Sequence, residues 1–229
     1  MQENNPHEGH RSRLRKKFLL NGTDAMEEHE ILELMLYYAI PRKDTNPISH
    51  RLLSKFGSIS AVLDASVENL KQEGLSENSA IYLSLIPQIC RVYMDDKFRN
   101  YDKIVTDDNI ADKIKYKFIG RNYEAVVLML LDSKNKEVFC GVISKGSIAS
   151  NEIYIRKIVE LAIIYNARAA VIAHNHPSGI ALPSGEDMVA TKRTFESLKL
   201  INVYLMDHII VADDDCVSLR QSGFMDKIR

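Results

Sequence analysis

The chain has 229 residues, of which 45% are hydrophobic, and a formal net charge of −1. These values describe a globular protein of one large or two ordinary domains and exclude a disordered or strongly basic chain. Every apolar run is shorter than the roughly 18–20 residues that a membrane span needs, and residues 1–6 lack the core of a signal peptide. Three cysteines without a CxxC pair suit a reducing compartment. We therefore expect a cytoplasmic protein with no membrane partner.

The N-terminal segment carries the sharpest cluster of charge in the sequence. Five cations fall within seven residues, just before the apolar residues 18–20: Arg11, Arg13, Arg15, Lys16 and Lys17. Such a cluster can meet the phosphates of DNA. The alternative is the solvated start of a helix without a partner. Because the chain as a whole is not basic, any DNA binding would depend on this local patch.

The next segment predicts a set of helices. Apolar residues at helical spacing indicate one helix over 27–38, stopped by Pro41, and several short helices within 48–94. Pro87 should kink or break the last helix. The turn Gly74-Leu75-Ser76 between two helices resembles a helix-hairpin-helix, which binds a DNA phosphate through backbone N–H groups. The alternative is a structural turn in which Ser76 caps the following helix.

The polar stretch 95–103 lacks periodicity and marks the boundary between an all-α domain at 1–103 and a second domain at 104–229. Beyond a helix that Thr106-Asp107-Asp108 would cap, the apolar period changes to that of strands. The sequence predicts strands at 125–131, 138–143, 169–173, 203–206, 208–212 and 216–219, a helix at 152–165, and a solvated turn at Asp213-Asp214-Asp215. This mixture predicts an α+β or α/β second domain.

The strand 169–173 leads into His174-Asn175-His176-Pro177. Because alternate residues of a strand share a face, His174 and His176 should point the same way, and Pro177 should end the strand. After a turn at Ser178-Gly179, Ser184 precedes a helical pattern with Asp187 in its first turn. Two imidazoles and a carboxylate suit zinc and leave a fourth position for water. For Ser184 and Asp187, the alternative interpretation is a helix cap.

The pattern His-x-His-Pro, six residues, Ser-x-x-Asp resembles the JAMM (JAB/MPN+) metalloprotease signature. The longer string, with His174 to Gly179, Thr191 and Asp207-His208, resembles the RadC family, a bacterial branch of that superfamily. The resemblance covers most of the chain. It implies a curved mixed β-sheet flanked by helices, preceded by a helix-hairpin-helix-like region. It also implies that Zn²⁺ bound by His174, His176 and Asp187 supports hydrolysis of peptide or isopeptide-like amide bonds.

The same resemblance assigns roles to further residues. It implies that Glu124, just before the strand 125–131, is the general acid/base that moves a proton from water to the leaving amine. The alternative for Glu124 is a surface acid at a strand start. Ser184 would donate a hydrogen bond to the developing oxyanion. The pair Asp207-His208 would either line the site or shape the sheet.

Three departures from the related patterns limit these implications. Asn175 stands where JAMM deubiquitinases usually have Ser or Thr, which argues against a ubiquitin-type isopeptidase. Ser76 replaces the second Gly of the family's hairpin, and Lys157 replaces a Glu that RadC proteins often carry. The alternative function is a DNA-associated, repair-linked accessory protein whose metal domain is not catalytic. The chain lacks the H-x-E…P-C-x-x-C signature of zinc deaminases.

Overall fold

The computed structural model describes residues 6–98, 104–106, 109–146, 152–177, 179–212 and 215–227. The chain divides into two compact units, Met1–Ile89 and Cys90–Arg229. Residues 99–103, the predicted cap at Asp107-Asp108, the turn residue Ser178 and the acids Asp213-Asp214 lie outside the described residues. The domain boundary at 103/104 therefore stays a prediction. Every helix within the described ranges is too short or too polar to cross a lipid bilayer.

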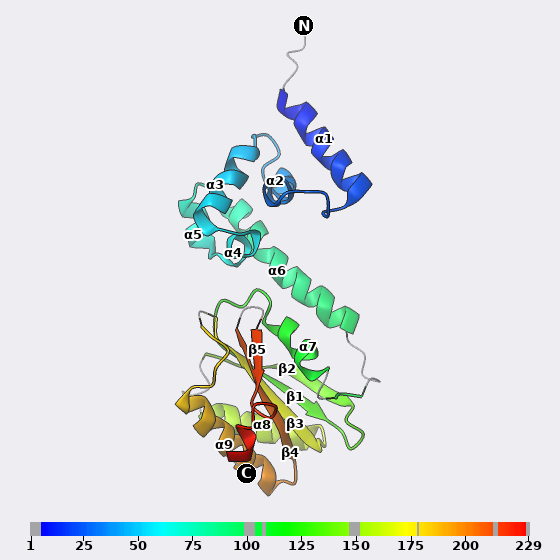
Figure 1. Ribbon diagram of the computed structural model, residues 1–229, viewed down its shortest axis with the longest axis vertical. Helices are drawn as coiled ribbons and strands as arrows, with labels where there is room; N and C mark the ends of the chain where they lie inside the picture. The colour runs from blue at the N-terminus through cyan, green and yellow to red at the C-terminus, as the bar shows by residue number, and fades with distance from the viewer. Residues whose placement is uncertain are drawn as a thin grey trace. The chain divides into compact units, whose positions relative to one another are not determined.

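The first unit is helical, as the sequence predicts (Figure 1). Its helices are α1 (Pro6–Asn21), α2 (Glu28–Ala39), α3 (Asn46–Phe56), α4 (Ile59–Asp64), α5 (Val67–Gln72) and the first part of α6 (Glu77–Phe98). Gly57 ends α3 at φ 92°, a conformation that residues with a Cβ rarely adopt. Buried side chains from α2, α3, α4, α5 and α6 form one apolar core. Helix α6 runs through Pro87, so the break that was one expected outcome there does not occur.

The second unit contains a five-stranded mixed sheet flanked by helices, which confirms the predicted α+β class (Figure 1). Its elements are α7 (Ile110–Lys115), η1 (Tyr116–Phe118), β1 (Ala125–Leu131), β2 (Glu137–Lys145), α8 (Glu152–Ile164), β3 (Ala169–Asn175), α9 (Gly185–Leu200), β4 (Tyr204–Ala212), β5 (Asp215–Ser218) and η3 (Met225–Lys227). The strand order is β2-β1-β3-β4-β5. The pair β3–β4 is parallel, and the other three pairs are antiparallel.

The prediction of separate strands at 203–206 and 208–212 is wrong, because β4 is continuous. Its register against β3 shifts between Ala170, which pairs with Leu205, and Val171, which pairs with Asp207. The extra residue at this bulge is Met206. The apolar pattern looks interrupted in the sequence because Asp207 and His208 are polar, although both are buried within the strand.

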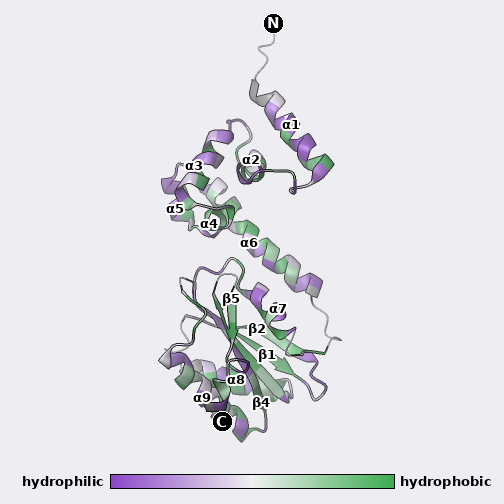
Figure 2. Cartoon of the chain, in the orientation of Figure 1, coloured by the Kyte–Doolittle hydropathy of each residue, from purple (hydrophilic) through white to green (hydrophobic). Residues whose placement is uncertain are grey.

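Both faces of the sheet are covered, so β1 and β3 are buried along their whole length, and both are apolar up to the His174-Asn175 end of β3 (Figure 2). Val126, Leu128 and Ile172 belong to the core shared with α8 and α9. The alternate residues of β1 and β3 face α7 and η1. His174 therefore lies on the α9 face of β3, in line with Ile172.

Candidate metal centre

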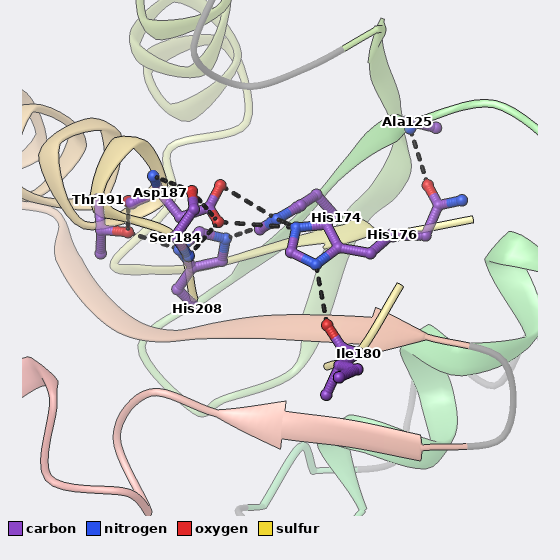
Figure 3. A network of polar contacts seen from close by, with 9 residues as sticks. Ala125, His174, His176, Ile180, Ser184, Asp187, Thr191 and His208 are labelled. Atoms are coloured by element: carbon purple, nitrogen blue, oxygen red, sulfur yellow. Dashed lines mark hydrogen bonds and ion pairs between the residues drawn. The ribbon is translucent and has the colours of Figure 1, made fainter. Parts of the chain in front are cut away.

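Three predicted ligands come together at the end of β3. The ligand atoms of His174, His176 and Asp187 all lie within 4.8 Å of one another. The two histidine Nε2 atoms are 2.9 Å apart, and His174 Nε2 is 3.2 Å from Asp187 Oδ1. His176 Nε2 is 3.6 Å from Asp187 Oδ2. Figure 3 shows the two imidazoles and the carboxylate pointing toward one another.

These separations fit a small divalent cation. Tetrahedral zinc ligands at about 2.0–2.1 Å from the metal are roughly 3.3 Å apart, and the three measured separations of 2.9, 3.2 and 3.6 Å lie around that value. His174 and Asp187 are only 3% and 5% exposed, whereas His176 is partly exposed. The group is therefore sheltered from bulk water but can be reached from one side. The three residues can hold a metal ion. The distances do not identify the metal, and the preference for zinc comes from the types of ligand.

Two local devices position the ligands. The backbone N–H of His176 donates to Val211 O at 2.8 Å, which keeps the chain paired with β4 for one residue beyond β3. Pro177 follows, and the strand ends as predicted. On the other side, Ser184 is the N-cap of α9, and it forms a reciprocal capping box with Asp187. The cap that was the alternative interpretation of this pair is thus present, and it also points the carboxylate at the imidazoles.

The carboxylate of Asp187 is held in its charged form. Burial alone would raise its pKa, but the contacts of the carboxylate with His174 and Ser184 lower the pKa well below its ordinary value. Ser184 donates to Asp187 Oδ2 both from its backbone N–H, at 2.7 Å, and from its hydroxyl, at 2.6 Å. In this arrangement the only proton of the Ser184 hydroxyl goes to Asp187. The role of Ser184 as an oxyanion donor stays a prediction.

Glu124 lies next to the first residue of β1. Its backbone carbonyl accepts from Gly146 N–H at 2.7 Å, so the extended pairing with β2 continues through Glu124. The register pairs Val126 with His174. Glu124, two residues before Val126, and His176, two residues after His174, therefore lie at the same end of the sheet. The Glu124 carboxylate is partly buried and forms no ion pair or hydrogen bond with the described residues.

Asn175, between the two histidines, ties the Glu124 segment to β3. Its Oδ1 accepts from Ala125 N–H at 2.8 Å (Figure 3), and its Nδ2 donates to the carbonyls of Tyr123 and Arg121 at 3.1 and 3.4 Å. The side chain is 5% exposed. Where the backbone hydrogen bonds between β1 and β3 end, the Asn175 side chain supplies hydrogen bonds to the segment before β1. Sequence reasoning placed Asn175 on the opposite face from the histidines but did not identify this role.

The pair Asp207-His208 divides between the two roles expected for it. Asp207 shapes the sheet, since its carboxylate accepts from the Ser218 hydroxyl at 2.5 Å and from the backbone N–H groups of His208 and Arg220. Burial raises the pKa of Asp207. His208 lines the site, because its Nε2 lies 2.8 Å from Nδ1 of His174 (Figure 3). Burial lowers the pKa of His208 well below the usual value for an imidazole.

The N-terminal cations are only partly available to a partner. Arg11 donates to three backbone carbonyls in the loop after α2, those of Ile40, Pro41 and Lys43, at 2.5–2.8 Å. Its guanidinium also lies over the Tyr37 ring, 4.5 Å from the centroid. These contacts make Arg11 a structural residue of the first unit.

The remaining cations differ from Arg11 and from one another. Lys17 pairs with Glu30 at 2.5 Å, whereas the other three are exposed: Arg13, Arg15 and Lys16. In the Gly74-Leu75-Ser76 turn, Leu75 is buried and the Ser76 hydroxyl accepts from Ser79 N–H at 3.2 Å. Ser76 therefore acts as the N-cap of α6, as the alternative interpretation of a structural turn predicted. Binding of DNA by the cluster or the turn stays a prediction.

Comparison with known proteins identifies the family of this chain. Residues 104–224 match the family model described as the RadC-like JAB domain. The chain is 34% identical to a UPF0758 protein of Fusobacterium nucleatum subsp. nucleatum, over 95% of this chain and 97% of that protein. It is 32% identical to a UPF0758 protein of Neisseria gonorrhoeae, over 93% and 95% of the two chains. It is 30% identical to one of Ectopseudomonas mendocina, over 93% and 96%. Because the family model covers more than half of the sequence and these relatives nearly all of it, the chain belongs to the RadC family.

Proposed function

We propose that this protein is a zinc-dependent hydrolase of the JAMM type that cleaves peptide or isopeptide-like amide bonds. The observation that carries the proposal is the convergence of two imidazole nitrogens and one carboxylate, with separations of 2.9–3.6 Å. Two imidazoles and one carboxylate are a set that suits zinc and leaves a coordination position for water. Membership of the RadC-like JAB family supports the same assignment.

A zinc ion in such a site lowers the pKa of water to about 7 and polarises a substrate carbonyl. Glu124 is the proposed general base and acid: it accepts a proton from the attacking water and passes it to the leaving amine. Its position at the same end of the sheet as His176 and its lack of a partner among the described residues support this role. Ser184 would turn its hydroxyl from Asp187 Oδ2 toward the developing oxyanion.

The proposed location is the cytoplasm. All three cysteines are free: Cys90, Cys140 and Cys216. A chain whose cysteines remain unpaired suits a compartment that keeps thiols reduced. This location would expose the site to cytoplasmic peptides and proteins as substrates.

The first test is the metal content of chelator-free protein, measured by mass spectrometry. We expect about one zinc ion per chain in the wild type and a large loss in His176→Ala, because that variant removes one of three ligands. The control is Glu186→Gln, which changes an exposed carboxylate next to the site and should keep the metal. Wild-type protein that binds no divalent metal at micromolar concentration would refute the proposal.

The second test separates metal binding from catalysis. A library of internally quenched peptides should be cleaved by the wild type and by Glu186→Gln, and left intact by Glu124→Gln, which should retain its zinc. Loss of a general base typically costs about 10²–10⁴-fold in rate. Cleavage by Glu124→Gln at the wild-type rate would show that another group moves the proton.

The alternative proposal is a DNA-associated accessory role in which the metal domain is not catalytic. The exposed cations Arg13, Arg15 and Lys16 on α1 are the residues of the charged cluster that remain available for it. Full zinc occupancy without cleavage of any peptide, together with salt-dependent DNA binding, would favour this alternative over the hydrolase.

A further inference from the structure

A series of short polar contacts leads from His174 through His208 and Thr191 to the backbone carbonyl of Asp187 (Figure 3). His174 Nδ1 lies 2.8 Å from Nε2 of His208, on β4. The other ring nitrogen of His208, Nδ1, lies 2.6 Å from the hydroxyl of Thr191, on α9. That hydroxyl is 2.5 Å from the backbone carbonyl of Asp187. His208 and Thr191 are both 0% exposed, so these contacts have no access to bulk water.

The donor and the acceptor in the hydrogen bond of His208 with Thr191 follow from the last contact, between Thr191 and Asp187. A carbonyl oxygen can only accept, so the Thr191 hydroxyl must donate its single proton to Asp187 O. The hydroxyl can then only accept from His208, which places a proton on His208 Nδ1. His174 can offer Nε2 to a metal ion only if its own proton lies on Nδ1, and Nδ1 faces His208 Nε2 at 2.8 Å. In that arrangement His208 Nε2 accepts the hydrogen bond from His174 Nδ1–H, while His208 Nδ1–H donates to Thr191.

We propose that Thr191 and His208 are positioning residues that fix the tautomer of His174, so that its Nε2 presents a lone pair to a metal ion. The inference rests on the proposed metal site and adds the residues that prepare it. His176 reaches the same state by a shorter route. Its Nδ1 is 3.1 Å from Ile180 O, and since that carbonyl can only accept, Nδ1 carries the proton and Nε2 is free of it.

This order of protons leaves the Nε2 atoms of His174 and His176 available as ligand atoms beside the Asp187 carboxylate. Both Nδ1 atoms are committed as donors, so two Nε2 lone pairs and a carboxylate face one another at 2.9–3.6 Å. Such a set of acceptors is repulsive unless a cation lies among them. The contacts of Thr191 and His208 thus prepare His174 Nε2 as a ligand atom.

The direct test is the tautomer of each ring, read from long-range ¹H–¹⁵N correlation spectra of the full-length protein. We expect His208 to be neutral, with its proton on Nδ1 and a bare Nε2, in both the metal-free and the zinc-loaded protein. Thr191→Val keeps the shape of the side chain but removes the oxygen that accepts from His208 Nδ1–H. In this variant the spectra should show a mixture of His208 tautomers and not the Nδ1-protonated form alone. A wild-type His208 protonated on Nε2 would overturn the inference.

Metal affinity gives the second readout. Co²⁺ titration, followed by its visible absorption, should show about 10- to 100-fold weaker binding in His208→Leu, the range seen when the partner of a ligating histidine is lost. His208→Gln, whose side-chain oxygen can accept from His174 Nδ1–H, should recover most of the affinity. Thr191→Ser should bind Co²⁺ like the wild type. Equal affinity in His208→Leu and His208→Gln would mean that His208 only fills space.

Failure of this inference and failure of the proposed function give different results. If wild-type protein binds neither Zn²⁺ nor Co²⁺, the proposed function fails, whatever the tautomer spectra show. If the wild type binds metal and His208→Leu binds it equally tightly, the metal site is confirmed and the positioning role of Thr191 and His208 is wrong. Thermal unfolding of each metal-free variant separates a loss of affinity from a loss of folding. A variant that binds metal weakly because it is misfolded should also have a lower melting temperature than the wild type.

Discussion

Replacing Asn175 by Ala removes the side chain that holds the Glu124 segment against β3. The variant leaves Ala125 N–H without an acceptor, and residue 125 is 0% exposed. An unsatisfied buried donor costs about 1–3 kcal/mol. The carbonyls of Tyr123 and Arg121 also lose a donor, but these residues are at least partly exposed and water can replace it. We therefore expect the free energy of unfolding to fall by about 1–3 kcal/mol, most of it from one N–H group.

A second variant separates the acceptor and donor roles of the same side chain. Asn175→Asp keeps an oxygen for Ala125 N–H but directs a carboxylate toward the two carbonyls that Nδ2 now contacts. A buried carboxylate facing carbonyl oxygens is strongly unfavourable. At pH 7 we expect Asn175→Asp to be less stable than Asn175→Ala, although it is closer in shape to the wild type.

The assay is urea unfolding of the metal-free protein, followed by circular dichroism and extrapolated linearly to water. Gln221→Ala, which truncates an exposed amide in the same unit, serves as the control and should change stability by less than about 0.5 kcal/mol. A change of that size or smaller in Asn175→Ala would refute the reasoning. So would an Asn175→Asp variant as stable as the wild type. In either case the Glu124 segment would be held by other contacts.

Four further results are expected. Burial raises the pKa of Tyr154 to about 12, above the roughly 10 of an unfolded chain, so its stabilisation is fully present below pH 10 and is lost as the pH rises toward 12. Unfolding free energies measured between pH 9 and 11.5 should fall more steeply in the wild type than in Tyr154→Phe. Burial also raises the pKa of the Cys140 thiol to about 12; at pH 8, iodoacetamide should label exposed Cys90 and leave Cys140 unmodified, as read by peptide mass spectrometry. Arg11→Ala should lower the melting temperature, because three carbonyls lose their donor. Joint replacement of Arg13, Arg15 and Lys16 by Ala should leave the melting temperature unchanged and flatten the salt dependence of any DNA binding seen by fluorescence anisotropy.

The elements that the sequence predicts well are those whose signal is local. The seven-residue run Ala125–Leu131 is wholly buried, and its continuous apolar character indicates a strand covered on both faces. Ser184 and Asp187 define the start of α9 through a cap that involves only four residues. The bulge at Met206 could not be predicted, because it is a mismatch in register between two strands and has no signature within β4 alone.

The ligands of the candidate site were predictable for the same reason. His174 and His176 are two residues apart on one strand, and strand geometry alone puts them on one face. Their partners were not predictable, because each contact joins elements that are distant in the sequence. His208 meets His174 only because β4 pairs in parallel beside β3. Asn175 meets Ala125 because β1 pairs antiparallel on the other side.

This difference separates two kinds of control over the site. The identity of the ligands is encoded by one segment, 174–187, and substitutions there remove ligand atoms outright. The proton order of the ligands is encoded by α9 and β4, through Thr191 and His208. The position of the proposed acid/base Glu124 is encoded by Asn175, which faces away from the metal ligands. Substitutions at these supporting residues should therefore change metal affinity and turnover separately, whereas substitution of a ligand should abolish both. A measured set of variants in which metal affinity and turnover always fall together would show that the site acts as one unit and that this division is wrong.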